Sequence, residues 1–361
     1  MPGPNVERRA FVRHAATLTL LAPGLGAALV SCRTDEAHHQ TPGSDASTDT
    51  PTPTPNPDSK LDSTLAPAPA GATATPDLTA VRYHRVDPAL PPAPPDHRLA
   101  VHFHAREALV RLSGDTVVAA WTFEGDVPGP RLHCHVGDTV DFTLTNDVAM
   151  PHSMDFHAAQ IDPKTAFRSA LKGQSVSYRF TPKYPGVFLY HCGTAPVLLH
   201  LGSGMFGAIV VSPREPLPRA REFVLVQNEF YLGPAANGVR PFAYDRMLST
   251  LPDFVTFNGR PDQYGREPLR AKVGERVRFW VANAGPTHPC AFHVVGEQFD
   301  TVYLGAPPGN AIHGVQTWSV PAGGGMCFEL QADVAGEFAV VNHSFGHGQK
   351  GAIGRLVVEE A

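Results

Sequence analysis

The sequence predicts an all-β protein that contains two tandem β-sandwiches, and two observations support this prediction. First, from about residue 81 onward, short apolar or alternating stretches rich in Val, Phe, Thr and Ile are bounded by Gly, Pro, Asn and Asp. Such stretches of roughly four to eight residues are typical of strands, and no long amphipathic helical pattern interrupts them. Second, LHCHVGDTVDFTLTN at 132–146 and LRAKVGERVRFWVAN at 269–283 share one pattern at the same spacing. The chain therefore carries two copies of one sandwich.

The expected strands and the remaining repeat matches follow in chain order. The strand stretches are DTVDFTLTND (138–147), SVSYRFTP (175–182), GAIVVSP (207–213), ERVRFWVANAG (275–285) and GRLVVEE (354–360). The further matches are PGVFLYHC (185–192) with AGEFAVVN (335–342), and FGAIVV (206–211) with GAIGRLVV (351–358). We place the first sandwich at 81–215 and the second at 216–361.

Composition points to a metalloprotein and argues against a nucleic-acid partner. The 361 residues are 42% hydrophobic and 17% charged, which is enough to bury a substantial core in two domains. A formal net charge of −5 lacks the basic excess that nucleic-acid binding needs. Eighteen histidines accompany five cysteines, and imidazole is the commonest protein ligand for zinc, copper and iron.

The N-terminal segments are predicted to lie outside the folded part. Residues 1–32 have the basic start, short apolar run and small residues of an export signal. Arg8 and Arg9 in an Arg-Arg-x-Phe core are typical of a twin-arginine signal, and LVSC is typical of a lipobox that would lipidate Cys32. The alternative is an ordinary cleaved signal with an incidental cysteine. Either way we expect an exported protein, in the periplasm or lipid-anchored at the outer face of the cytoplasmic membrane.

Residues 33–80 are predicted to be a disordered linker. They are dominated by Pro, Thr, Ser, Ala and Asp and hold almost no aromatic residue. Such a segment cannot bury enough apolar surface to offset its ordering entropy. If Cys32 is lipidated, this linker would tether the folded part to the membrane.

The stretch YHCGTAPVLLHLGSGMFG predicts a blue-copper site. Cys192, His200 and Met205 are spaced C-x7-H-x4-M, and His152 follows a proline in the segment expected to approach the same end of the sandwich. Together they offer a thiolate, two imidazoles and a weak thioether, the donor set of blue-copper electron-transfer sites. Alone, Cys192 or Met205 would be read as a core residue. The spacing of the whole set favours copper.

Strand alternation predicts a second metal site beside the first. Adjacent residues of a strand point to opposite faces, so His191 faces away from the side that Cys192 faces. His157 lies five residues after His152 and diverges from it in the same way. A third imidazole would come from the second sandwich, where His343 is the first candidate and His347 the second. Three histidines leave one coordination position open for water or substrate.

From about residue 81 to 361 the chain resembles copper-containing nitrite reductases of the two-cupredoxin type. The motifs that carry the resemblance are PHSMDFHAA, PGVFLYHC with its downstream histidine and methionine, AFHVVGEQFD and VVNHS. It implies two tandem cupredoxin-like Greek-key sandwiches and dissimilatory reduction of nitrite to nitric oxide and water, as in denitrification. Type 1 copper would be held by His152, Cys192, His200 and Met205, and type 2 copper by His157, His191 and His343.

The resemblance also implies partners and a proton-delivering pair. In the family the third histidine comes from the neighbouring subunit of a homotrimer, and a small cupredoxin or cytochrome donates electrons. Asp155 matches the family's proton-carrying aspartate and would share the face of His157. His293 matches the family's histidine, and AFHVVG aligned with DFHAA puts it where His157 stands in the first copy.

Two rival functions come from different classes. A laccase-like two-domain multicopper oxidase would reduce oxygen, and the pairs His102/His104 and His133/His135 favour it. However, the YHCGT stretch lacks the His-Cys-His of such oxidases, and the second domain has no His-x-His pair. The other rival is a blue-copper electron-transfer protein whose second site is inert.

The remaining cysteines leave two arrangements open. Cys134, Cys290 and Cys327 would form one disulfide and one free thiol, or three buried thiols.

Overall fold

The computed structural model describes residues 76–361, which belong to one compact unit. The export signal predicted for 1–32 and the linker predicted for 33–80, apart from its last five residues, lie outside the described residues. Within 76–361 the fold is almost entirely β, which confirms the predicted class. The helices are short, and no described helix has the length and hydropathy needed to cross a membrane.

The first sandwich consists of two sheets packed face to face. One sheet has the strand order β10-β2-β1-β4-β6 and the other β3-β8-β7-β5. The strands are β1 (Arg98–Ser113), β2 (Thr116–Phe123), β3 (Leu132–His135), β4 (Thr139–Asn146), β5 (Asp155–Phe156), β6 (Ser175–Phe180), β7 (Gly186–His191), β8 (Phe206–Ser212) and β10 (Val239–Arg240). Two short helices, α1 (Pro163–Ala166) and α2 (Val197–Gly202), connect them.

The second sandwich repeats this plan. Its sheets have the orders β11-β9-β13-β18-β15-β16 and β12-β20-β19-β14-β17. The strands are β9 (Arg221–Phe230), β11 (Phe254–Phe257), β12 (Glu267–Lys272), β13 (Arg276–Gly285), β14 (Cys290–Val294), β15 (Phe299–Tyr303), β16 (Ala311–Val315), β17 (Thr317–Val320), β18 (Gly325–Gln331), β19 (Gly336–Asn342) and β20 (Ile353–Glu359). The helices are α3 (Tyr244–Leu248), α4 (Gln263–Arg266) and α5 (Phe345–Gln349).

The repeat in the sequence is a repeat in the pairing of strands. β3 runs parallel to β8 as β12 does to β20, and β4 runs parallel to β1 as β13 does to β9. In the hairpin β7–β8 His191 faces Phe206, and in β19–β20 Val341 faces Ile353. This register equates residue 191 with 341 and residue 206 with 353, as the aligned stretches predict.

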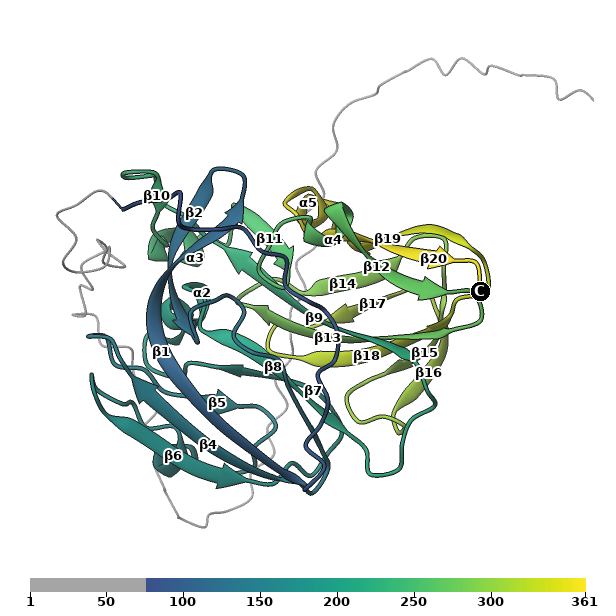
Figure 1. Ribbon diagram of the computed structural model, residues 1–361, viewed down its shortest axis with the longest axis horizontal. Coiled ribbons are helices and arrows are strands. Elements are labelled where there is room, and N and C mark those ends of the chain that lie inside the picture. The colour runs from purple at the N-terminus through teal and green to yellow at the C-terminus, as the bar shows by residue number, and fades with distance from the viewer. Residues whose placement is uncertain (1–75) are drawn as a thin grey trace, which may run out of the picture. The chain divides into compact units, whose positions relative to one another are not determined.

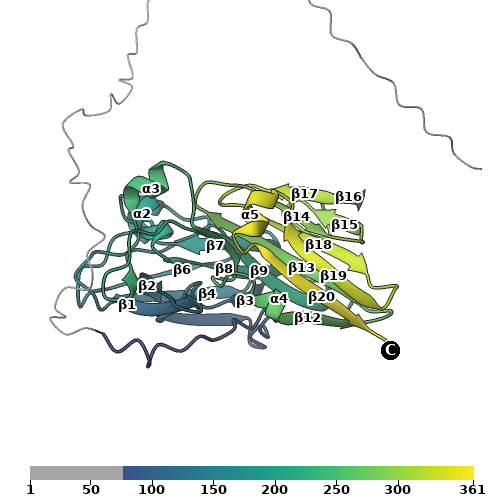
Figure 2. The ribbon, with the colours of Figure 1, turned by 90° about the horizontal axis from the view of Figure 1, so that it is seen from above.

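Figures 1 and 2 show the two sandwiches side by side, the first in blue and teal and the second in green and yellow. Each contributes a segment to the other. β10 follows β9 in the chain but pairs with β2 of the first sandwich, and Val224 of β9 donates its backbone N–H to the carbonyl of Pro88. The boundary near residue 216 falls between β8 and β9.

Three apolar cores hold the assembly together. One lies inside the first sandwich and includes Cys192 and Met205, and a second lies inside the second sandwich. The third joins β7 and β8 to β9 and β13, so the two sandwiches share a continuous interior. A Cβ at Gly325 would lie 2.0 Å from the carbonyl oxygen of Val187, so the close approach there requires glycine.

All four described cysteines are free and buried, which settles the open question in favour of thiols. Burial raises the pKa of the Cys134 thiol to about 12, and it raises those of Cys290 and Cys327 strongly as well. These thiols are therefore inert core residues at neutral pH.

Candidate metal centres

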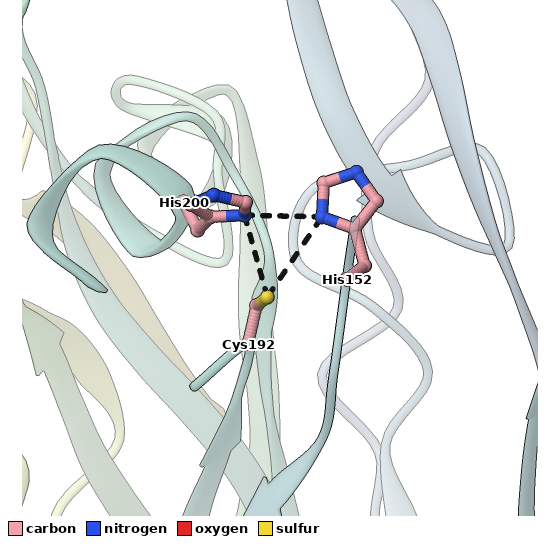
Figure 3. Close-up of side chains that lie close together, drawn as sticks. All are labelled: His152, Cys192 and His200. Carbon is pink, nitrogen blue, oxygen red and sulfur yellow. Dashed lines mark hydrogen bonds between the residues drawn. The ribbon is translucent and has the colours of Figure 1, made fainter. Parts of the chain in front are cut away.

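The first cluster consists of His152, Cys192 and His200, whose side chains are fully buried. Figure 3 shows the cysteine sulfur and the two imidazoles pointing toward one another. The two Nδ1 atoms lie 3.0 Å apart, and the sulfur lies 3.4 Å from Nδ1 of His200 and 3.8 Å from Nδ1 of His152. Three donor atoms thus converge on one point inside the first sandwich.

Local structure explains this convergence. Cys192 directly follows β7, His200 lies in α2, and His152 is held by a bridge to Ala170. The chain then returns to β8, and the carbonyl of Met205 accepts the N–H of Cys192 at 3.0 Å. Met205 is fully buried in the same apolar core, so the structure brings all four predicted residues into one region.

The surroundings favour neutral imidazoles and, without a metal ion, a protonated thiol. Burial lowers the pKa of His152 to about 3, helped by the neighbouring imidazole, and lowers that of His200 to about 4. Each therefore keeps a free lone pair at neutral pH. Burial raises the pKa of the Cys192 thiol, whereas hydrogen bonds from Ser153 and Thr194 oppose that shift. The backbone N–H of Ser153 lies 3.4 Å from the sulfur.

Sequence reasoning missed two groups of this cluster. The N–H of Ser153 has no side-chain signature, although its position next to His152 hints at it. The other is Trp121 of β2, whose buried ring lies 4.9 Å from the His200 ring and 5.5 Å from the His152 ring, between centroids. It closes one side of the cluster with an apolar wall.

The second cluster contains Asp155, His157 and His191 and is more exposed. Asp155 of β5 pairs directly with His191 of β7, and its Oδ2 lies 3.9 Å from Nε2 of His191. Nε2 of His157 lies 3.1 Å from the same nitrogen. The predicted divergence of the two faces is present, because His191 and Cys192 belong to different clusters although they are consecutive.

The hydrogen bonds of this cluster leave two imidazole lone pairs facing each other. Nδ1 of His157 lies 3.0 Å from the carbonyl oxygen of Gly323, and Nδ1 of His191 lies 2.9 Å from that of Cys192. A carbonyl only accepts, so both Nδ1 atoms carry the hydrogen, and in the neutral imidazoles both Nε2 atoms are bare. Burial also lowers the pKa of His191. Two bare nitrogens at this separation suit a cation between them.

The carbonyl that orients His157 comes from the second sandwich and has no signature in the sequence. Gly323 lies in the turn between β17 and β18, with φ of +77°. Backbone hydrogen bonds join this turn to Asn283 of β13, and the Asn283 amide donates to the carbonyls of His288 and Val320.

A line of buried amides continues from that turn. Gln227 donates to the Asn283 oxygen at 3.3 Å and accepts from the Asn342 amide at 2.7 Å. All three amide side chains are fully buried. These hydrogen bonds therefore link the turn that orients His157 to Asn342, the last residue of β19, which directly precedes His343.

His343 and His293 lie together in the second sandwich. Their ring centroids are 5.2 Å apart, and the ring of exposed Phe345 lies 4.5 Å from that of His343. Among residues 76–361 no three-ligand cluster includes His343, so a single chain does not bring it to His157 and His191. Nδ1 of His293 donates to the carbonyl of Gln316 at 2.6 Å.

The expected equivalence of His293 with His157 is wrong. His293 pairs with Val341 as Asp155 pairs with His191, so His293 is the counterpart of Asp155. The N–H of Val295 bonds to the Ala339 carbonyl as that of His157 does to Leu189, which makes Val295 the counterpart of His157. Phe292-His293 therefore lies two positions away from Phe156-His157 in the strand register. Because side chains alternate with a period of two, His293 still faces the same side of the sheet as His157 does.

The His-x-His pairs join no copper-like cluster. His102 contacts Thr145, and His104 contacts Asp147. Both nitrogens of His133 are engaged, by the Pro91 carbonyl and the Ser212 hydroxyl. Neither pair assembles with the histidines of the second sandwich in the described part of the chain.

Comparison with known proteins gives one consistent family. A family model described as multicopper oxidase matches residues 104–216. Copper-containing nitrite reductase of Neisseria meningitidis is 38% identical over 298 residues, covering 79% of this chain and 76% of that protein.

Solved structures agree with this. Copper nitrite reductase from Nitrosomonas europaea superposes with a TM-score of 0.67 at 38% identity, over 72% of this chain and 94% of that one. A multicopper oxidase superposes with a TM-score of 0.65 at 25% identity, over 74% and 92%. The chain also places a cysteine–imidazole cluster next to an imidazole pair, through the consecutive residues His191 and Cys192. With this identity and coverage, the chain belongs to the family of copper-containing nitrite reductases.

Proposed function

We propose that this protein reduces nitrite to nitric oxide and water, using one electron and two protons per nitrite. The observation that carries the proposal is the adjacency of Cys192 and His191. One peptide bond joins a buried thiolate–imidazole cluster to a half-exposed imidazole cluster, which gives a short covalent path for single electrons.

His152, Cys192, His200 and Met205 would hold type 1 copper. The converging donor atoms, the complete burial and the depressed imidazole pKa values fit a thiolate-bound copper. His157 and His191 would hold type 2 copper through their bare Nε2 atoms. When bound, the first ion relays single electrons, and the second offers an open position where nitrite is reduced.

The third ligand of the type 2 site would be His343 of the partner subunit. Two protein nitrogens alone leave the site incomplete, and His343 lies apart from it within one chain. A homotrimer in which each active site lies between two subunits would complete three-histidine coordination.

Asp155 would carry protons to the substrate. Its carboxylate is part of the second cluster, partly exposed, and 3.9 Å from Nε2 of His191. It can therefore take a proton from solvent and hold it beside the open position. His293, as its counterpart in the other sandwich and a neighbour of His343, would reach the same site from the partner subunit.

Oxygen reduction by a laccase-like site is the weaker proposal. A three-copper cluster requires the His-x-His pairs as ligands, yet His102, His104 and His133 are engaged by protein groups. His135 is grouped with His97 and Asp138, and with no histidine of the second sandwich, in the described part of the chain. Electron transfer alone would leave the bare nitrogens of His157 and His191 without a role.

We also propose export and attachment to the outer face of the cytoplasmic membrane through Cys32, with a small cupredoxin or cytochrome as electron donor. The support is the pattern of the first 32 residues. Labelling of the protein with a radioactive fatty acid, lost in Cys32→Ala, would test the anchor.

The central test measures nitric oxide directly. Full-length protein holding two coppers per chain is kept without oxygen and supplied with a reduced mediator and nitrite, and nitric oxide is followed with an electrode. We expect steady production that disappears in His157→Ala and persists in His102→Ala, a control outside both clusters. Oxygen consumption without nitric oxide would instead establish the oxidase function.

A further inference from the structure

A third group of metal-ligating side chains lies outside both copper clusters. His97 precedes β1, His135 ends β3, and Asp138 follows a tight turn and directly precedes β4. Their ligand atoms lie within 4.8 Å of one another. Nδ1 of His97 lies 2.9 Å from Oδ1 of Asp138, a hydrogen bond whose proton a metal ion would replace, and Nδ1 of His135 lies 3.5 Å from Oδ2.

These separations suit a tetrahedral ion. Zinc binds imidazole nitrogen and carboxylate oxygen at about 2.0–2.1 Å, which places neighbouring ligand atoms roughly 3.3 Å apart. The two imidazole rings are nearly perpendicular, at 76°, with centroids 6.4 Å apart. The imidazoles of His97 and His135, which lie on either side of the Asp138 carboxylate, can therefore direct a nitrogen at one shared metal ion.

The Nδ1 atom of His135 lacks a partner. It is buried but makes no hydrogen bond, because the distance and angle to Asp138 do not form one. A buried polar atom without a partner destabilises the fold, and a metal ion aligned with its lone pair would remove that cost.

The Asp138 carboxylate lacks a permanent counter-charge. It is completely buried, and its ion-pair partners among the described residues are the two imidazoles alone. The Arg214 guanidinium packs over Gly137 but forms no ion pair with Asp138. A divalent cation would balance the buried charge.

The second sandwich shows what an ordinary version of this turn looks like. Glu275 replaces Asp138 and Lys272 replaces His135 in the aligned repeats. Each carboxylate accepts the N–H of the residue three before it, at 2.9 Å for Glu275 and 2.7 Å for Asp138. Glu275 also pairs with Arg221 at 3.2 Å. The turn itself thus needs only a carboxylate, whereas the imidazoles belong to the first sandwich alone.

We propose that His97, His135 and Asp138 bind a divalent transition-metal ion of the zinc class, with water completing the coordination. His133 is excluded as a ligand, since both of its nitrogens are engaged elsewhere. The ion would fasten the start of β1 to the turn between β3 and β4. This site is independent of the copper clusters and of the proposed reaction.

The test titrates Zn²⁺ into full-length protein whose copper sites are already filled, by calorimetry and by metal analysis after gel filtration. We expect one zinc per chain. Removal of one of three ligands should weaken binding at least about tenfold, since loss of a mere outer-shell partner already costs that much. Co²⁺ in place of Zn²⁺ should give visible bands that report its ligands.

His97→Ala is the decisive variant, because the His97 side chain is 65% exposed and the substitution should leave the fold intact. His135→Ala should give the same loss. The matched control is His84→Ala, which removes an imidazole paired with Asp126 but in no three-ligand cluster of the described chain. Absence of zinc binding, or equal binding by wild type and His97→Ala, would overturn the proposal. Blue absorption and circular dichroism should match in all variants.

Discussion

The two sandwiches carry different side chains at a point where their strand pairing corresponds. Cys192 and Asn342 occupy equivalent positions, and in both the neighbouring strand directs the same backbone N–H at the side chain. The N–H of Ser153 meets the cysteine sulfur at 3.4 Å, and that of Ala291 meets the asparagine oxygen at 3.2 Å. The same backbone arrangement thus holds the Cys192 side chain in one sandwich and the Asn342 amide in the other.

The other ligand positions complete the contrast. By the ladder register and the loop hydrogen bonds, the counterparts of His152, His200 and Met205 are Cys290, His347 and Ala352. Only His347 is still an imidazole, and its ring lies tilted beside that of His288, with centroids 4.7 Å apart. The backbone of either sandwich thus supplies the pocket and an N–H group directed into it. The side chains at the four ligand positions decide whether that pocket binds a metal ion.

The largest expected effect follows from making the first pocket resemble the second. Cys192→Asn removes the thiolate, so blue absorption and nitrite turnover should fall to background, measured by visible spectroscopy and a nitric oxide electrode. The reciprocal Asn342→Cys should remain colourless, because Cys290 and Ala352 offer no imidazole or thioether. Colour in the reciprocal variant would break the comparison.

The next effect separates His343 from His347. His343→Ala should abolish turnover and the type 2 copper signal in electron paramagnetic resonance, while blue absorption persists. His347→Ala should keep both signals, because His347 lies at the position of His200 and is half-buried beside His288. Loss of the type 2 signal in His347→Ala alone would reassign the ligand.

Asp155 and His293 occupy equivalent positions, so parallel substitutions sharpen their roles. Asp155→Asn keeps the shape but removes the proton carrier, and turnover should fall about 10²-fold or more. The dependence of turnover on pH should change shape, because the carboxyl no longer supplies the proton, while copper content stays constant. An unchanged profile would exclude Asp155 as the proton donor.

A moderate effect is expected from breaking the amide line between the sandwiches. Gln227→Leu removes one hydrogen bond from each of the buried amides of Asn283 and Asn342, at a combined cost of about 1–3 kcal/mol in free energy of unfolding. Urea denaturation measures this. Because the line supports the Gly323 carbonyl, the type 2 signal should broaden while the blue absorption is unaltered. A change confined to the blue absorption would contradict this linkage.

The last prediction concerns acid stability and applies to the metal-free protein alone. The folded-state pKa values of about 3 for His152 and about 4 for His200 lie below the unfolded value near 6.5. The unfolded state therefore binds more protons in this window, and stability is lost as pH falls from about 6.5 toward 4. The slope should reach about 2.7 kcal/mol per pH unit, from two protons. His200→Gln should halve it, as urea unfolding at several pH values would show.

Much of this protein could be predicted from local pattern. Short apolar stretches between turn residues define the strands, because period-two burial and turn chemistry are local properties. The spacing of Cys192, His200 and Met205 predicts a copper-type donor set, and alternation along the strand predicts that His191 faces the opposite side. Each of these inferences requires only the chain's own periodicity.

The tertiary structure alone decided the rest. His293 matches His157 in sequence but Asp155 in space, because register is fixed by hydrogen bonds to β19 and not by similarity of residues. The Gly323 carbonyl that orients His157 is invisible in sequence, since every residue carries a carbonyl and only folding selects one. Likewise His97 joins His135 and Asp138 because β1 lies parallel to β4. Sequence determined which chemical groups were present and on which face of a strand, and only the packing of distant strands decided which of them meet.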